Sequence, residues 1–368
     1  MNQIEIIANF DNMHKAYKRV VSRNTGTVAA MKFEKHALEG IDRLQYALLS
    51  GEYEMGPYMV FSVHYPKERL VKACCFKDKI VQRSACHEVL WPMMDPHLIT
   101  DNYASREGMG TKMAVDRFKS NLYNYYQHYG NVGYILKIDV KKYFYSINND
   151  ILKEQMRGYG FDQSILSLLD LIIDSMCHEV RNGVRYGVPI GNQTSQNFAV
   201  QYLNPVDHFI KDQLGIKYYG RYMDDSYIIG NSKAELNDLK DVIRDKCALL
   251  DLELNGKTQV IPIHKGITFL GKRFELSPTG KITTRLTSQN IRHRHAEIHK
   301  KAALVALGEL SADEFWQSFV AWNGYAKHAD TYRIRHEMYA YAKEELHNAL
   351  KQQLRTELSY KSGIPLRS

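Results

Sequence analysis

The sequence has no long apolar run, no paired cysteine spacing and no low-complexity segment. A membrane-spanning helix needs roughly 20 consecutive apolar residues, and no segment provides them. Residues 1–15 lack the basic start, apolar stretch and small-residue cleavage site of a secretory signal. The five cysteines are odd in number and show no CxxC spacing, which argues against a disulfide framework or a zinc site. We therefore expect a cytoplasmic protein with free thiols.

The composition that remains is that of a globular protein with an uneven charge. The 368 residues are 44% hydrophobic and 24% charged, which is enough for two or three closely packed units. Of the formal net charge of +8, a surplus of 5 lies in residues 281–368, where 14 Lys or Arg stand against 9 Asp or Glu. Basic helices with interleaved Tyr and Trp suit a phosphate backbone, although a run of charges is more often a solvated face.

Hydrophobic periodicity predicts an α+β order of elements. Helices are expected over residues 36–49, 112–129, 163–176, 195–214, 233–250, 290–307, 311–327 and 331–354, and strands over 134–140, 258–263 and 267–274. Ser195 is expected at the N-cap of the helix over 195–214. This order predicts a small antiparallel sheet backed by helices, with a helical appendage at the end of the chain.

Two adjacent carboxylates, Asp224 and Asp225, lie between the apolar runs IKYYGRY and SYIIG. This pattern predicts a β-hairpin whose turn contains both acids. Asp-Asp in a surface turn is common, but strands this apolar favour a cation between the two charges. A third carboxylate, Asp139, ends the strand predicted over 134–140 and can face the hairpin from a neighbouring strand.

Three such carboxylates suit nucleotidyl transfer. In that reaction two Mg²⁺ ions about 3.5–4 Å apart stabilise the attacking 3′-hydroxyl and the leaving pyrophosphate. Mg²⁺ prefers hard oxygen ligands in octahedral geometry. The sequence therefore predicts a metal site, while a lone Asp at the end of a strand is more often a cap or turn residue.

Motifs in a consistent order resemble those of reverse transcriptases. LKIDVKKYFYSIN is similar to their first palm motif, Tyr222-Met223-Asp224-Asp225 to their catalytic hairpin, and ITFLGKRF to their primer-grip hairpin. YPKERLVKACCFKDKIVQRS and NYASREGMGT resemble the fingers motifs, and LELNGKT resembles a further palm segment. The resemblance spans residues 53–274 and implies an α+β right-hand polymerase. Its implied parts are N-terminal helices and fingers over 1–133, a palm strand over 134–146, a second part of the fingers over 147–187, a palm with hairpin and primer grip over 188–280, and a helical basic thumb over 281–368.

The resemblance also implies roles for individual residues. The implied catalytic residues are Asp139, Asp224 and Asp225, which with Val140 would hold two Mg²⁺ ions, or Mn²⁺ as a substitute. The implied nucleotide-binding residues are Lys67, Arg69, Lys72, Phe144, Ile190, Gly191, Gln196 and Lys257, and the implied template or primer contacts are Arg106, Tyr222, Met223, Leu270 and Gly271. Arg69 would hold the triphosphate through its bidentate guanidinium, Phe144 would exclude a 2′-hydroxyl, and Lys257 would assist the leaving pyrophosphate.

For several of these residues a structural explanation stays open. Arg69 fits an exposed basic strand, the aromatic run around Phe144 fits a core, and Lys257 fits a surface lysine. The chain also departs from the family pattern after Arg69, where Ala73-Cys74 stands in place of the usual Ile-Pro.

The segment Val188–Gln196, VPIGNQTSQ, indicates a subtype. Most reverse transcriptases have Gln-Gly after this proline, whereas IGxxxSQ resembles the enzymes of diversity-generating retroelements, as does GYAKHADTYRI near the end. The resemblance implies RNA-directed synthesis of cDNA from dNTPs, with errors at template adenines and mutagenic retrohoming. It implies a template RNA and a small, basic, helical accessory protein that forms an oligomer. A turn leading into a helix, with Gly191 present for backbone freedom, is the structural alternative.

Other functions remain open. The rivals are a retron enzyme, an intron maturase without its extra domains, a phage-defence polymerase and a non-catalytic RNA-binding scaffold with a polymerase fold. Retrons normally keep the glutamine that Ile190 replaces. The Cys/His metal spacing of a maturase endonuclease is not found in the last part of the sequence. All three carboxylates are present, which gives no sign of a decayed enzyme.

Overall fold

The computed structural model describes residues 2–63, 68–175 and 177–362. The chain folds as two compact units, which are unit 1 (residues 1–117 and 136–260) and unit 2 (residues 118–135 and 261–368). Three elements begin in one unit and end in the other: α7 (Thr111–Tyr129), β3 (Tyr134–Asp139) and β8 (Gln259–Pro262). The division into fingers, palm and thumb implied by the motifs follows other boundaries and stays a prediction.

Unit 1 begins with four helices. They are α1 (Gln3–Ala8), α2 (Phe10–Arg23), α3 (Val28–Glu34) and α4 (Ala37–Ser50). Asn2 and Glu5 form a capping box on α1, and the side chains of Asn9 and Thr27 accept hydrogen bonds from the first turns of α2 and α3. The helix predicted over 36–49 is confirmed as α4. α2 packs against α4 and against α5 (Phe76–Ala85).

A two-stranded hairpin and a long helical stretch follow. β1 (Met59–Val63) and β2 (Arg69–Ala73) pair antiparallel. After them, α5 continues through a π-helical turn at Cys86–Leu90 into α6 (Trp91–Met94) and a short 3₁₀ turn at Asp95–His97. Pro92 lies in the first turn of α6 and lacks the amide hydrogen that a regular α-helix uses, which fits the widened turn before it.

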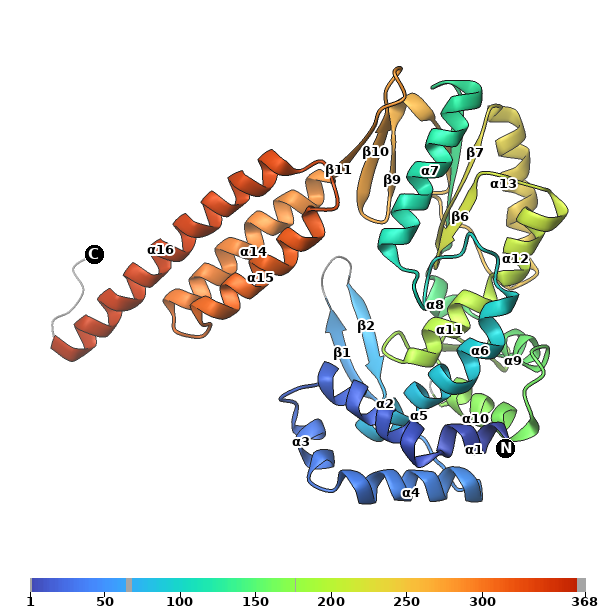
Figure 1. The fold of residues 1–368 in the computed structure, drawn as a ribbon, viewed down its shortest axis with the longest axis horizontal. Coiled ribbons are helices and arrows are strands. Elements are labelled where there is room, and N and C mark those ends of the chain that lie inside the picture. The colour runs from blue at the N-terminus through green and yellow to red at the C-terminus, as the bar shows by residue number, and fades with distance from the viewer. Residues whose placement is uncertain (1, 64–67, 176, 363–368) are drawn as a thin grey trace. The chain divides into compact units, whose positions relative to one another are not determined.

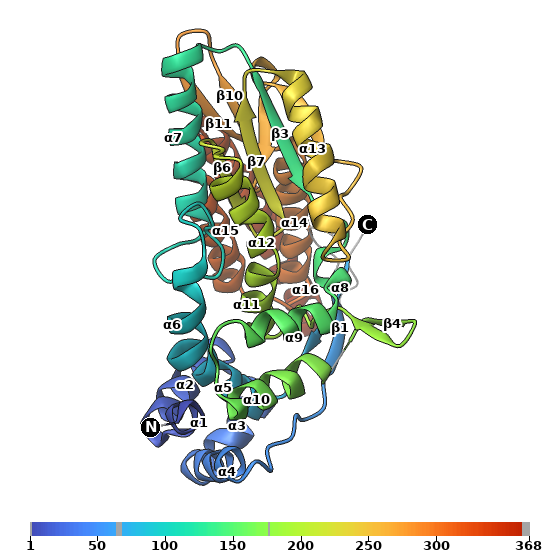
Figure 2. The same cartoon turned by 90° about the vertical axis from the view of Figure 1, so that its right-hand side faces the viewer.

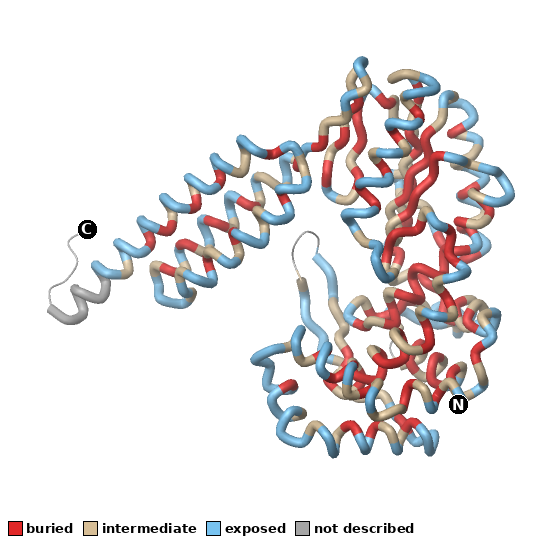
Figure 3. The backbone as a smooth tube through the Cα atoms, viewed as in Figure 1, coloured by how far each residue is buried: buried red, intermediate tan, exposed pale blue. Residues whose placement is uncertain are grey.

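A four-stranded sheet lies at the end of unit 1 away from α1–α4 (Figures 1 and 2). Its order is β6 (Tyr219–Tyr222), β7 (Asp225–Gly230), β3 and β8, and β6 pairs antiparallel with β7. Residues 226–229 are all buried, so both faces of this part of β7 are covered (Figure 3). The other elements of the unit are α8 (Tyr143–Ser146), α9 (Asn149–Arg157), α10 (Gln163–Asp174), β4 (Glu179–Arg181), β5 (Val184–Tyr186), α11 (Gln193–Tyr202), α12 (Asn204–His208) and α13 (Lys233–Ala248).

The single helix predicted over 195–214 is wrong in two respects. The structure has α11, then α12, then a π-helical turn at Phe209–Gln213. Pro205 lies at the start of α12, where its missing amide hydrogen interrupts the helix after Leu203. Asn192, not Ser195, is the N-cap of α11, and Ser195 is buried inside the helix.

Unit 2 consists of a small sheet and three long helices. β9 (Ile267–Phe269), β10 (Lys272–Leu276) and β11 (Ile282–Leu286) form an antiparallel sheet in the order β11-β10-β9. Residues 267–274, which periodicity predicts as strand and the family resemblance as a hairpin, form a hairpin, and its two turn residues Leu270 and Gly271 have φ of +48° and +73°. Phe118 of α7 packs on this sheet, with its ring 5.5 Å from that of Phe269 and 4.9 Å from that of Phe274.

The last three helices share one apolar core. They are α14 (Ser288–Ala306), α15 (Ala312–Ala326) and α16 (Tyr332–Ser362). Their buried side chains include Ile298, Phe315, Phe319 and Met338. The predicted helical appendage is confirmed, as are the α+β class and the free state of all five cysteines. Within the described ranges, no helix has the length and apolarity needed to cross a membrane.

Candidate active site

The Tyr222-Met223-Asp224-Asp225 segment forms a tight hairpin, as predicted. Tyr222 pairs with Asp225, so Met223 and Asp224 are the two turn residues. Met223 has a φ of +57°, in the left-handed region. A non-glycine residue in such a sparsely populated region costs on the order of 1–3 kcal/mol, and strain of this kind gathers at functional sites. Met223 and Tyr222 pack against a buried cluster of Leu98, Ala104 and Val200.

A buried ion pair holds this turn in place. The Arg221 Nε donates to both carboxylate oxygens of Asp207, at 2.8 and 2.9 Å, and the two residues are 2% and 0% exposed. Other guanidinium nitrogens donate to the carbonyl oxygens of Met223 at 3.0 Å and Val200 at 2.8 Å. The hydroxyl of Tyr219 donates to Asp207 at 2.6 Å. One side chain thereby joins the hairpin to α11 and α12.

Arg221 stays protonated despite its burial. Burial by itself lowers the pKa of a guanidinium, but the charge of Asp207 and its hydrogen bonds outweigh that effect and raise the pKa of Arg221 above its ordinary value. Sequence reasoning missed this pair, although an arginine inside an otherwise apolar strand was a visible signal.

Asp139 ends β3 and is fixed by the segment that follows α13. Its amide donates to Thr258 Oγ1 at 3.1 Å, and its carbonyl accepts from the Thr258 hydroxyl at 3.2 Å and from the Asn255 amide at 2.7 Å. Val140, which is buried, forms a β-bridge with Leu254. The LELNGKT segment therefore lies directly beside Asp139. Lys257 is exposed in the turn next to Thr258.

Asp139 and Asp225 lie on neighbouring strands, because β3 and β7 are adjacent in the sheet. Lys137 lies two residues before Asp139 and therefore on the same face of β3. Its Nζ is 3.5 Å from Asp225 Oδ1, which places that carboxylate alongside the end of β3. Sequence reasoning also missed Lys137, whose charge was visible in the alternating pattern of the strand.

The donor set suits Mg²⁺ by its chemistry. Asp139, Asp224 and Asp225 offer carboxylate oxygens, which are the ligands that Mg²⁺ prefers. In the part of the chain that the structure describes, no group of three or more His, Cys, Asp or Glu side chains is placed to hold a metal ion. Metal binding by these three residues and Val140 therefore stays a prediction.

Two of the predicted triphosphate contacts, Arg69 and Lys72, lie on β2. Arg69 is exposed at the first position of the strand, and Lys67 lies outside the described residues. The Lys72 ammonium donates to the carbonyl oxygen of Cys177 at 2.9 Å, so it braces the backbone in this structure. The amide of Cys74 donates to Asn192 Oδ1 at 3.3 Å. Ala73-Cys74, the departure from the family pattern, thus meets the Ile190-Gly191 segment.

Packing against β2 explains Gly191. A Cβ atom at this position would lie 2.7 Å from the carbonyl oxygen of Lys72 and 2.9 Å from Cα of Ala73, closer than real contacts allow. The φ of Gly191 is not in the left-handed region, so backbone freedom, the structural alternative given above, is not the reason for this glycine. Asn192 adds a further contact to this segment, since its Nδ2 donates to the Tyr58 hydroxyl at 2.8 Å.

Phe144 lies in the short helix α8, between the same two segments. Its carbonyl oxygen accepts from the amide of Val188 at 2.9 Å. The hydroxyl of Tyr145 donates to the carbonyl of Leu70 on β2 at 3.3 Å, and the buried Tyr143 donates to the carbonyl of Ala199. Phe144 itself is half-buried. Its role at the sugar stays a prediction.

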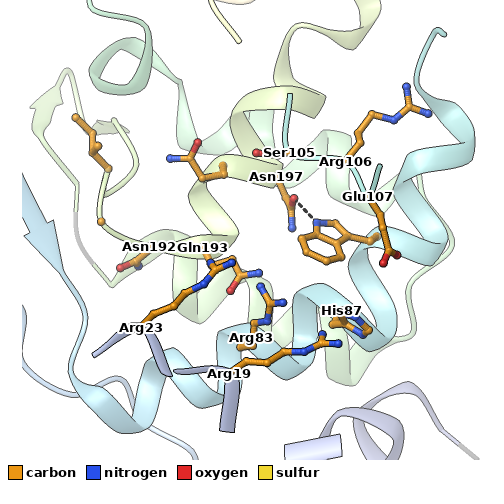
Figure 4. A pocket seen from close by; sticks show the side chains of 14 residues that line it. Arg19, Arg23, Arg83, His87, Ser105, Arg106, Glu107, Asn192, Gln193 and Asn197 are labelled. Carbon is orange, nitrogen blue, oxygen red and sulfur yellow. Dashed lines mark hydrogen bonds between the residues drawn. The ribbon is translucent and has the colours of Figure 1, made fainter. Parts of the chain in front are cut away.

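The structure groups four of the predicted contact residues around one cavity of about 560 Å³ (Figure 4). Ile190, Gly191, Gln196 and Arg106 all line it. The Arg106 guanidinium also donates to the carbonyl oxygens of Ile99 and Asn102, at 3.0 and 3.1 Å, so it braces the preceding loop. Leu270 and Gly271 belong to unit 2 and form the β9–β10 turn described above.

The acidic hairpin beside a strand that ends in a third acid is the arrangement that the sequence predicts for a polymerase site. The sequence profile of the family "Reverse transcriptase (RNA-dependent DNA polymerase)" matches residues 65–274, more than half of the chain. The protein belongs to the reverse transcriptase family, and its fold is the polymerase fold of that family.

Individual relatives are distant. The putative COX1/OXI3 intron 1 protein of Saccharomyces cerevisiae is 20% identical over 230 residues, which are 60% of this chain and 26% of that protein. The chain thus spans about a quarter of the length of this curated relative. Among solved structures, apo telomerase from Candida tropicalis is 14% identical with a TM-score of 0.49, covering 82% of this chain and 62% of that one. Telomerase from Candida albicans, in complex with a fragment of telomeric RNA, is 9% identical with a TM-score of 0.43, covering 83% and 62%.

Proposed function

We propose that this protein is an RNA-directed DNA polymerase that extends a primer by two-metal nucleotidyl transfer. The observation that supports this most is the placement of Asp139 at the end of β3, next to the strand that begins with Asp225. Asp139, Asp224 and Asp225, with the Val140 carbonyl, would hold two divalent ions, which activate the 3′-hydroxyl and stabilise the leaving pyrophosphate. Mg²⁺ is the expected ion, with Mn²⁺ as a substitute.

The chain's own residues would bind and orient the nucleotide. Arg69, exposed on β2, offers a bidentate guanidinium to the triphosphate. Phe144 would pack against the sugar and exclude a 2′-hydroxyl. Lys257 is exposed beside the segment that fixes Asp139, where its ammonium could stabilise charge on the leaving group.

We further propose that the enzyme belongs to the diversity-generating class and makes cDNA with errors at template adenines. The support is the Ile190-Gly191 pair, which places an apolar side chain in the cavity wall where most of the family has glutamine. An isoleucine gives shape without an oriented hydrogen bond, and the loss of such a bond weakens discrimination between correct and incorrect pairs. In this class, a structured template RNA and a small basic accessory oligomer are the expected partners, and diversification of a target gene is the expected outcome.

Primer extension tests the polymerase activity. The protein is assayed on poly(rA)/oligo(dT) with Mg²⁺, beside Asp224→Asn and the control Asp42→Asn, which removes an exposed carboxylate from α4. We expect the wild type and Asp42→Asn to extend the primer and Asp224→Asn to lose at least a thousandfold in rate. A folded wild type that extends nothing with Mg²⁺ or Mn²⁺ would support the non-catalytic scaffold instead.

Fidelity tests the subtype. Misincorporation opposite template adenine is compared with that opposite the other three bases for the wild type, Ile190→Gln and the apolar control Ile190→Val. We expect an error excess at adenine in the wild type and in Ile190→Val, and a reduced excess in Ile190→Gln. Equal errors at all four bases in the wild type would contradict the diversity-generating assignment and leave a retron or phage-defence enzyme as the better description.

A further inference from the structure

The cavity lined by Ile190 and Gly191 also collects four arginines from elements far apart in the chain. Arg19 and Arg23 lie one turn apart on α2, Arg83 lies on α5, and Arg106 lies in the loop before α7. Figure 4 shows Arg19, Arg23 and Arg83 grouped along one wall. Glu107 is the one carboxylate among the described lining residues. The cavity is therefore strongly cationic.

These arginines repel one another. Burial and then the positive charges of Arg19 and Arg23 lower the pKa of Arg83. The buried Nε of Arg83 has no hydrogen-bond partner within the described residues, and its guanidinium lies 5.5 Å from the centre of the Trp91 ring. A bound anion would stabilise this arrangement, because it would offset the repulsion between the arginines and accept a hydrogen bond from the Arg83 Nε.

The rest of the lining includes neutral polar side chains and one aromatic ring. It contains the amide side chains of Asn192, Gln193, Gln196 and Asn197, together with Trp91. The Trp91 indole donates to Asn197 Oδ1 at 2.6 Å, which fixes the ring. Amides and an aromatic ring beside guanidinium groups are what proteins use to hold single-stranded nucleic acid, where phosphates meet cations and bases meet polar or aromatic groups.

We propose that this cavity binds the phosphate backbone of the unpaired template RNA that leads into the active site. This proposal rests on the proposed polymerase function, because it takes Ile190 to lie beside the nascent base pair. A free nucleoside triphosphate is the other source of phosphate. It would bring Mg²⁺ with it, and Glu107 alone among the described lining residues could contribute a carboxylate to that ion.

The test measures binding rather than catalysis. A labelled RNA–DNA duplex with a single-stranded 5′ template overhang is compared with a blunt duplex, using the full chain. Every protein in this binding test contains Asp224→Asn, and the wild type of the test contains that change alone. The test variant is Arg19→Gln/Arg23→Gln. Its control is Lys15→Gln/Lys18→Gln, which removes the same charge from exposed positions of the same helix that do not line the cavity.

We expect the wild type to bind the overhang duplex more tightly than the blunt one. The test variant should lose most of that difference, at least tenfold in Kd, with unchanged affinity for the blunt duplex. Two lost contacts to single-stranded phosphates should also reduce the slope of log K against log salt by about 1.4. The control should keep the overhang preference of the wild type.

Two results would overturn the proposal. One is a test variant that keeps the overhang preference. The other is a test variant, with Asp224 restored, whose KM for dTTP rises while the overhang preference stays, because the cavity would then hold the nucleotide. Primer extension by the wild type on poly(rA)/oligo(dT) reports on the polymerase function separately.

Discussion

Met223 adopts a backbone conformation that is unfavourable for methionine, and Arg221 holds it there through a hydrogen bond to its carbonyl oxygen. The same guanidinium is paired with Asp207 in a fully buried setting. Burying two charges is costly in itself, so this pair is weak evidence of stability. The pair instead fixes the position of the hairpin, because it links the hairpin to two helices that contain none of the predicted metal ligands.

Removing one member of the Arg221–Asp207 pair should strongly destabilise the fold. Arg221→Met leaves a buried, unpaired Asp207 carboxylate and should lower the free energy of unfolding by about 3–5 kcal/mol. The double variant Arg221→Met/Asp207→Leu should lose less than the sum of the two single variants, because no charge remains unpaired. Urea denaturation followed by circular dichroism measures both. Strict additivity would contradict the coupling inferred from the structure.

Gly191 allows a second test at the scale of one residue. Gly191→Ala forces a methyl group into the backbone of β2 and should destabilise by about 1–3 kcal/mol, as overpacking does. It should also reduce primer extension, since β2 contains Arg69. Gly324→Ala is the control, because its Cβ would meet nothing within 4 Å and α15 is helical there. That change should be neutral or slightly stabilising. Equal effects of the two substitutions would refute the packing argument.

Among the elements, the strand that ends in Asp139 depends on a neighbour more than a hundred residues later in the chain. The Thr258 hydroxyl both accepts from and donates to the Asp139 backbone. Thr258→Val keeps the shape and removes both bonds, so it should cost about 1–3 kcal/mol of stability. We expect kcat for primer extension to fall at least tenfold with little change in the KM for dTTP, whereas Thr258→Ser should stay near wild type. A fall confined to KM would contradict a role in placing Asp139.

Local patterns gave most elements but not their interruptions. Alternation identified β3, and the apolar runs around Asp224 and Asp225 identified the hairpin. Pro205 was a readable signal for the break between α11 and α12, but helical periodicity runs through this position. The error comes from giving hydrophobic spacing more weight than backbone chemistry.

The residue pairs that hold the site in place could not be predicted from local sequence patterns. Asp207 lies on a helix and Arg221 on a strand, and the loop between them decides that they meet. The same holds for Thr258 with Asp139 and for Asn192 with Tyr58. The arginines of the cavity come from α2, α5 and a later loop, so only the folded chain brings them together. Sequence motifs predicted which residues react, and tertiary structure reveals which residues hold them.

At the scale of the whole molecule, α14, α15 and α16 of unit 2 have an apolar core of their own. Phe319 is 3% exposed in the core shared by α14, α15 and α16, whereas its neighbour Val320 is 64% exposed. Phe319→Ala should destabilise unit 2 by about 3–5 kcal/mol, and Val320→Ala should be nearly neutral. Hydrogen exchange measured by mass spectrometry should show faster exchange in α14–α16 of Phe319→Ala and unchanged exchange in β3, β6 and β7. Equal acceleration throughout the chain would mean that it unfolds as one cooperative unit.

The contact between Gly191 and β2 also limits how this enzyme can evolve. Any side chain at position 191 must displace a main-chain segment, so selection for higher or lower copying accuracy has little freedom there. Positions 190, 193 and 196 line the same cavity and can change in size and polarity without moving a strand. Natural or laboratory lineages that alter their mutation spectrum should therefore accumulate substitutions at those three positions around an invariant glycine.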